Sequence, residues 1–174
     1  MEEKFELLEH VHHDSSMAAY TIEKLLDKLK DKDNKIKEYA EEILKEYQQF
    51  EEEARVLLKE GNKELSEPSF MAKMESSMGI SKEVKDDNSD SSIADMLIQG
   101  VSMGSIEIEK KLKEYEKDID KEHKKLARKY LKFQEKTIEN LKEYLSILDQ
   151  ELIILIFFIL FKITSKYQYK VVNM

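Results

Sequence analysis

Residues 91–115 read SSIADMLIQGVSMGSIEIEKKLKEY, the least charged helical stretch of a chain in which 38% of the residues are charged. Apolar or very small residues recur at positions 93, 97, 100 and 104, alternately four and three residues apart. This spacing predicts a helix that packs one face against other helices. Gly100 and Gly104 lie on that face, and a glycine inside a helix costs about 1 kcal/mol relative to alanine. We therefore expect a packing reason for both glycines. The same line of residues reaches the carboxylate of Glu107 one turn later.

The composition is typical of a helical bundle. The chain has 174 residues, 41% of them hydrophobic, with one proline and four glycines, which suits a single all-α domain with a core. A net charge of −8 argues against a general nucleic-acid binder, because phosphate binding needs a basic face. The absence of cysteine excludes disulfides, zinc–thiolate sites and thiol catalysis. The charged N-terminus has no signal-peptide pattern, so we expect a cytoplasmic location.

Three further stretches show the same alternation of apolar residues. We expect helices over about residues 3–29, 35–60 and 118–148, in addition to 91–115. Asp33 or Asn34 is a candidate N-cap for the second helix, and Asp90 or Ser91 for the third. Gly61 is the expected stop of the second helix. The residues expected to be nearly fully buried are Ile43, Tyr47, Phe50, Leu97, Leu131 and Ile138.

The lengths of the connections predict the topology. Short turns join the first helix to the second and the third to the fourth, so each pair is expected to be an antiparallel hairpin. Residues 61–90 are long enough to cross the whole bundle between the two hairpins. One long crossover in the middle is the ferritin-like arrangement. The sequence therefore predicts an all-α, ferritin-like, left-handed four-helix bundle over residues 1–148, with the first and fourth helices parallel.

Two segments resemble a known group of proteins. Residues 93–107, IADMLIQGVSMGSIE, look like the third helix of small ferritin-like proteins from low-GC bacteria. Residues 133–145, FQEKTIENLKEYL, are similar to the fourth helix of the same group. The resemblance covers about residues 1–146. It implies a fold and little about function, because the group is of uncharacterised function.

Ferritin-like di-iron centres take a Glu from each of two helices and Glu-x-x-His from each of the other two. This chain departs from that pattern, since its second predicted helix has no histidine. A reduced site with carboxylate and imidazole ligands stays open, and such ligands suit iron, manganese or zinc. The alternative is that the glutamates are solvated and the histidine has a structural role in the core. The candidate metal ligands are Glu9, His12, Glu46, Glu107 and Glu135.

The tail over residues 149–174 contains an uninterrupted apolar run, LIILIFFILF, at Leu152–Phe161. As a helix this run spans about 15 Å, half of a bilayer core, so a transmembrane span is not expected. An apolar run of this kind requires cover. We expect it to pair two copies into a homodimer, with a fold-back against residues 70–74 as the alternative and peripheral membrane contact as a minor option.

Two functions from different classes follow from these patterns. The first is a non-catalytic interaction or scaffold protein without a cofactor. The alternative is a metal-carboxylate protein that holds iron, manganese or zinc in the middle of the bundle. No nucleophile–base pair, phosphate loop or dinucleotide-binding motif is present in the sequence, so no catalytic residue is predicted.

Overall fold

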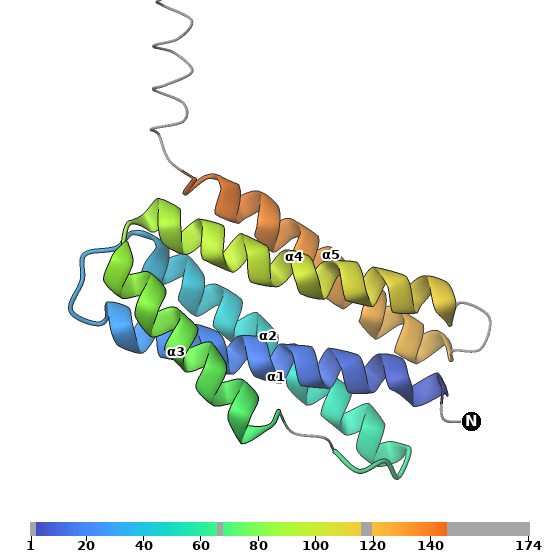
Figure 1. The fold of residues 1–174 in the computed structure, drawn as a ribbon. Coiled ribbons are helices and arrows are strands. Elements are labelled where there is room, and N and C mark those ends of the chain that lie inside the picture. The colour runs from blue at the N-terminus through green and yellow to red at the C-terminus, as the bar shows by residue number, and fades with distance from the viewer. Residues whose placement is uncertain (1–2, 66–67, 116–119, 146–174) are drawn as a thin grey trace, which may run out of the picture.

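The computed structural model describes residues 3–65, 68–115 and 120–145 (Figure 1). Over these ranges the protein is all-helical, which confirms the predicted class, and it contains no strand. None of the described helices combines the length and the apolarity that a membrane span needs. The five described helices are α1 (Glu3–Leu29), α2 (Ile36–Glu60), α3 (Phe70–Asp86), α4 (Asp90–Glu114) and α5 (Lys121–Lys142).

Contacts at the two ends of the molecule give the directions of the helices. α1 and α5 begin at the same end, where the rings of Phe5 and His123 lie 5.6 Å apart. α2 and α4 begin at the opposite end, where the Asp90 carboxylate accepts hydrogen bonds from the backbone N–H groups of Lys35 and Ile36. α1 and α5 therefore point one way, and α2 and α4 point the other way (Figure 1).

An aromatic cluster joins α2 to α5 in the middle of the core. The ring of Tyr47 lies 5.0 Å from that of Phe133 and 6.1 Å from that of Tyr130, in edge-on arrangements. Phe50 lies 5.0 Å from Tyr130. Edge-to-face pairs are more favourable than face-to-face stacks because of the ring quadrupole. The predicted burial of Ile43, Tyr47, Phe50 and Leu97 is confirmed.

The prediction for α5 is wrong at two positions. Leu131 and Ile138 are only partly buried, whereas Ala127, Tyr130, Gln134, Thr137 and Leu141 are fully or almost fully buried. Successive residues of a helix lie about 100° apart around its axis. A line of residues shifted by one position along the chain therefore fits the same alternation of three and four residues. Tyr130 turns inward because its ring packs on the rings of Tyr47 and Phe50.

Three predicted helix ends also differ from the structure. Asp90 accepts hydrogen bonds from the start of α2, and α4 is capped instead by Ser89, whose Oγ accepts from the N–H of Ser92. The start of α2 therefore receives its acceptor from another helix, and neither Asp33 nor Asn34 caps it. α5 ends at Lys142 rather than 148, because the next residues form tighter turns such as the Tyr144 N–H to Leu141 C=O bond. Residues 146–174, including the tail, lie outside the described residues.

α3 is a helix of 17 residues within the stretch that was expected to cross the bundle, where no helix was predicted. Its start is capped by Ser69, whose Oγ accepts from the N–H of Ala72. Only Ile80 and Val84 of this helix are buried, and a Thr21–Ser76 hydroxyl pair at 2.8 Å links it to α1. α3 therefore packs on the outside of the other four helices (Figure 1).

Candidate functional site

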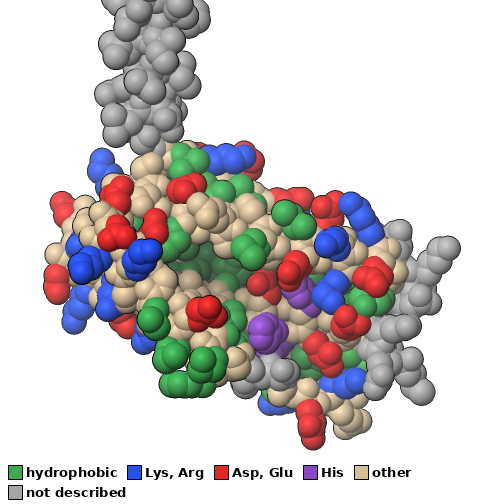
Figure 2. Space-filling view, viewed as in Figure 1, with side chains coloured by type: hydrophobic (Ala, Val, Ile, Leu, Met, Phe, Trp, Pro, Cys, Tyr) green, Lys and Arg blue, Asp and Glu red, His purple; other side chains and the backbone are tan. Residues whose placement is uncertain are grey.

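A cavity of about 190 Å³ opens between α1 and α4 and reaches α2 and α5. Figure 2 shows a hollow lined by hydrophobic side chains at this place, between α4 and the α1–α3 side of the molecule. We call it the Asp14 cavity, because the carboxylate of Asp14 lies in its wall. Most of the wall is apolar, and the side chains that form it are Met17, Ala18, Ile22, Met96, Leu97 and Val101.

The polar end of the Asp14 cavity is a hydrogen-bonded group from α1 and α5. Asp14 Oδ2 accepts from the Tyr130 hydroxyl at 2.7 Å and from Gln134 Nε2 at 2.9 Å. Gln134 is fully buried, and its Oε1 has no hydrogen-bond partner among the described residues. Asp14 forms no ion pair with a lysine or arginine of the described residues. The cavity therefore presents acceptor oxygens and a negative charge.

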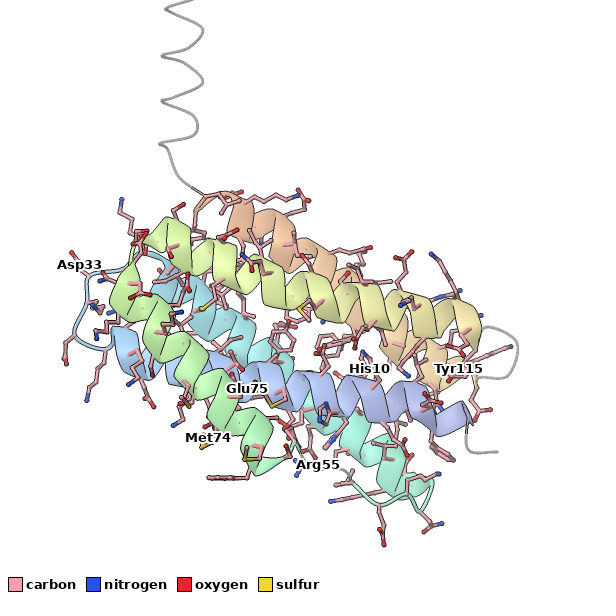
Figure 3. The ribbon with its side chains drawn as sticks, in the orientation of Figure 1. His10, Asp33, Arg55, Met74, Glu75 and Tyr115 are labelled. Carbon is pink, nitrogen blue, oxygen red and sulfur yellow. The ribbon has the colours of Figure 1, made fainter. Side chains whose placement is uncertain are left out.

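The described ionisable groups around Asp14 do not carry a positive charge that would balance its carboxylate. Burial, and after it the nearby Asp14 carboxylate, raises the pKa of Tyr130 and of Tyr47, so both phenols stay protonated at neutral pH. Burial lowers the pKa of the His10 imidazole, against the opposing effect of the Asp14 and Glu107 carboxylates. His10 lies between α1 and α4 in Figure 3. Since its ordinary value is already below 7, His10 is mainly neutral at pH 7.

The two glycines of α4 have opposite roles at this cavity. A Cβ on Gly104 would lie 2.6 Å from Asp14 Oδ2 and 2.6 Å from Gln134 Nε2, so only glycine lets this pair approach the helix. The packing reason expected for Gly104 is thus confirmed. Gly100 is exposed, and a Cβ there would meet no atom within 4 Å. The packing reason expected for Gly100 is wrong, and its missing side chain leaves the cavity open instead.

Alanine at these two positions is expected to change stability in opposite directions. Gly100→Ala should raise the free energy of unfolding by about 0.5–1 kcal/mol, because alanine is the better helix former and has room. Gly104→Ala should lower it by about 1–2 kcal/mol, because the added methyl group displaces the Asp14–Gln134 pair. Urea unfolding of both variants measures this difference. A stabilised Gly104→Ala protein would mean that the pair moves aside freely.

A second candidate site is the exposed side of α3. We call it the α3 face, and it consists of Phe70, Met71, Met74 and Met78, with exposed fractions of 78%, 64%, 41% and 66%. Three of these side chains line a shallow groove with Tyr20 of α1. Met74 lies on the outer side of α3 in Figure 3, in the region where Figure 2 shows hydrophobic side chains gathered. Methionine side chains adapt their shape, so such surfaces suit protein partners.

The residues predicted to bind a metal are not brought together around one point. Glu107 is 62% exposed, and its Oε2 lies 4.0 Å from Nδ1 of His10, whereas His12 is in the core at 1% exposure. The carboxylates of Glu46 and Glu135 are exposed, and Glu9 is partly buried. Across residues 3–65, 68–115 and 120–145, no three His, Asp or Glu side chains are grouped so as to hold a metal ion. The metal site stays a prediction.

The residue of the candidate site that the sequence patterns missed is Asp14. It lies between His12 and Ser15, which are both buried, and is itself partly buried. The available signal was Gln134, a polar residue three positions after Leu131 and four before Ile138, which were both expected to be buried, together with Gly104 on α4. A buried amide side chain needs hydrogen-bond partners. A glycine inside a helix marks a place where another side chain can approach that helix closely.

Comparison with known proteins adds no relative. No protein-family model, no curated protein and no solved structure matches the chain. The interpretation of the site therefore depends on the geometry described above.

Proposed function

We propose that this chain is a non-catalytic interaction protein, in which a helical bundle is the scaffold and the α3 face is the docking surface. The observation that carries the proposal is the exposure of Phe70, Met71, Met74 and Met78 on one helix. Large apolar side chains gathered on a monomer surface are typical of binding sites. Unlike α1, α2, α4 and α5, α3 has only two buried residues, Ile80 and Val84, so it adds little to the core.

We propose further that the scaffold is of the ferritin-like type. Two observations support this arrangement. α1 and α5 begin at one end while α2 and α4 begin at the other, as the contacts of Phe5 and Asp90 indicate. The connection from Gly61 to Ser89 starts beside Phe5, at the first end, and leads to Asp90 at the second. One long connection between two antiparallel hairpins is the ferritin-like pattern.

The occupant that we propose for the α3 face is the apolar run 152–161 of a second copy. α5 ends where Tyr144 stacks on Tyr39 near the start of α2, and residues 146–174 follow. The run is apolar throughout and requires cover, and the α3 face is an apolar surface of the same chain. If each copy places its run on the α3 face of the other, the two contacts are equivalent and the assembly closes as a symmetric dimer.

Light scattering on four proteins tests this assembly. The full chain should be a dimer, and a chain ending at Leu145 should be a monomer. Met74→Glu together with Met78→Glu should also give a monomer, because two charges would be buried in an apolar contact. The matched control is Met103→Glu with Ile106→Glu, which changes two exposed apolar residues of α4 and should remain a dimer.

Two outcomes contradict the proposal in different ways. A full chain that is monomeric removes the self-association, and the run 152–161 then packs within its own chain. A dimer that persists in the Met74→Glu, Met78→Glu protein leaves the dimer in place and removes the α3 face as its contact. Circular dichroism of each variant establishes that the helices are retained.

The metal-carboxylate function remains an alternative prediction. Elemental analysis of protein purified without chelator, followed by titration with ferrous ion, measures it directly. Glu107→Ala should abolish binding if Glu107 is a ligand.

A further inference from the structure

The size and lining of the Asp14 cavity define the body of a ligand. Its volume is about 190 Å³, and apolar side chains such as Met17, Leu97 and Val101 form most of its wall. An apolar protein cavity of about 150 Å³ is large enough to hold benzene. The Asp14 cavity therefore has room for one small ring or a short branched chain. Pockets with mostly apolar walls and a few convergent polar groups are typical ligand sites.

The polar end of the cavity defines the head group. Asp14 and Gln134 both line the polar end of the cavity. The side-chain oxygen atoms of these two residues are hydrogen-bond acceptors. A carboxylate has about four acceptor positions, and Asp14 uses two of them for Tyr130 and Gln134. Gln134 Oε1 has no partner among the described residues and is enclosed by the surrounding atoms, so a ligand in the cavity meets Asp14 rather than this oxygen. A ligand that satisfies Asp14 must donate hydrogen bonds.

The charge of the cavity selects among donors. The Asp14 carboxylate has no lysine or arginine partner in the part of the chain that the structure describes, and Tyr130 and Gln134 are neutral. A partly buried carboxylate attracts a cation more strongly than a neutral hydroxyl, because a charge-assisted hydrogen bond is the stronger one. An ammonium group supplies both the positive charge and several donors.

We infer that the Asp14 cavity binds a small primary amine, with the ammonium group at Asp14 and its apolar body against α1 and α4. In this arrangement the ammonium group donates to the Asp14 carboxylate. The hydrocarbon part lies along Met17, Leu97 and Val101. Gly100 lies at the opening, since it is exposed and lines the cavity.

Isothermal titration calorimetry with three probes of one shape tests the class of ligand. Benzylamine, benzyl alcohol and benzoate share a ring and differ in charge at the head group. Benzylamine should bind at least about tenfold more tightly than benzyl alcohol, and benzoate should not bind, because hydrogen bonds to charged groups are the stronger ones. Equal binding of the alcohol, or no binding of the amine, would overturn the inference.

Variants locate the binding. Gly100→Leu should abolish binding of benzylamine, because a large side chain at the rim blocks the opening, while its Cβ meets no atom within 4 Å. Gly79→Leu is the matched control, since Gly79 is an exposed helical glycine of α3 with no atom near its Cβ, and it should bind as the unchanged protein does. Asp14→Asn keeps the shape of the side chain and should weaken benzylamine at least about tenfold.

Retained binding in Gly100→Leu would place the amine on surface carboxylates of this acidic chain and overturn the inference. Asp14 and Gly100 do not belong to the proposed dimer contact on the α3 face. A result that contradicts the amine site therefore does not contradict the dimer, and the reverse also holds.

Discussion

Phe50→Ala is expected to lower the free energy of unfolding by about 3–5 kcal/mol, which is the usual effect of removing a buried phenylalanine ring. Phe50 is 1% exposed, and its ring lies 5.0 Å from that of Tyr130 and 5.2 Å from that of Phe133. Removing it takes away the central contact between α2 and α5. Because the neighbouring rings are held by Tyr47 as well, the core is expected to close only partly around the space left behind.

The matched control is the same substitution on an exposed residue. Phe70 begins α3 and is 78% exposed, so Phe70→Ala should change the free energy of unfolding by less than about 0.5 kcal/mol. Denaturant titration of both proteins, with the slope against denaturant compared, gives the two values. A loss below about 2 kcal/mol for Phe50→Ala would mean that α5 does not pack on α2 as described.

Four of the five described helices were predictable from the sequence because each buries a regular line of apolar residues. α2 is the clearest case, since Ile36, Ile43 and Phe50 recur at the spacing of a helix and all are buried. Its end was predictable from Gly61, and the structure adds the reason. A Cβ on Gly61 would lie 2.2 Å from the Phe5 ring, so the glycine allows α1 to pack over the end of α2.

α3 was not predictable from periodicity because little of it is buried. Ile80 and Val84 turn inward while Met74 and Met78 are exposed, so the apolar residues of α3 do not form one inward line that a pattern could detect. Its exposed apolar residues further obscure the contrast between the two faces. The local signal was Ser69 after Pro68, a serine in the N-cap position, and such a cap marks the start of a helix without giving its length.

The inward direction of α5 and the role of Asp14 were hidden for a shared reason. The sequence pattern ranks residues by apolarity, and the structure buries Tyr130 and Thr137 where the pattern favoured Leu131 and Ile138. Polar side chains are buried where partners exist, and Tyr130 and Gln134 find theirs in Asp14, 116 and 120 residues away along the chain. Tertiary partners of that separation do not appear in any local pattern.

Asp14→Ala is expected to lower the free energy of unfolding by about 2–4 kcal/mol, because it leaves two buried donors without an acceptor. The donors are the Tyr130 hydroxyl and Gln134 Nε2, both on fully buried residues. An effect of this size requires that neither donor finds a new acceptor in the protein. The adjoining cavity admits some water, which keeps the expected loss below the full penalty of two enclosed donors.

Tyr130→Phe separates the two donors in the same measurement. It removes one donor and keeps the ring, so a loss of about 0.5–1.5 kcal/mol is expected. The double variant Asp14→Ala with Tyr130→Phe should lose less than the sum of the single variants by about 1 kcal/mol, because the unsatisfied hydroxyl is no longer present. Additive losses would show that Tyr130 does not depend on Asp14. The hydrogen-bonded group at the polar end of the Asp14 cavity would then have to be reassigned, since one acceptor on α1 is what joins Tyr130 and Gln134 of α5 to it.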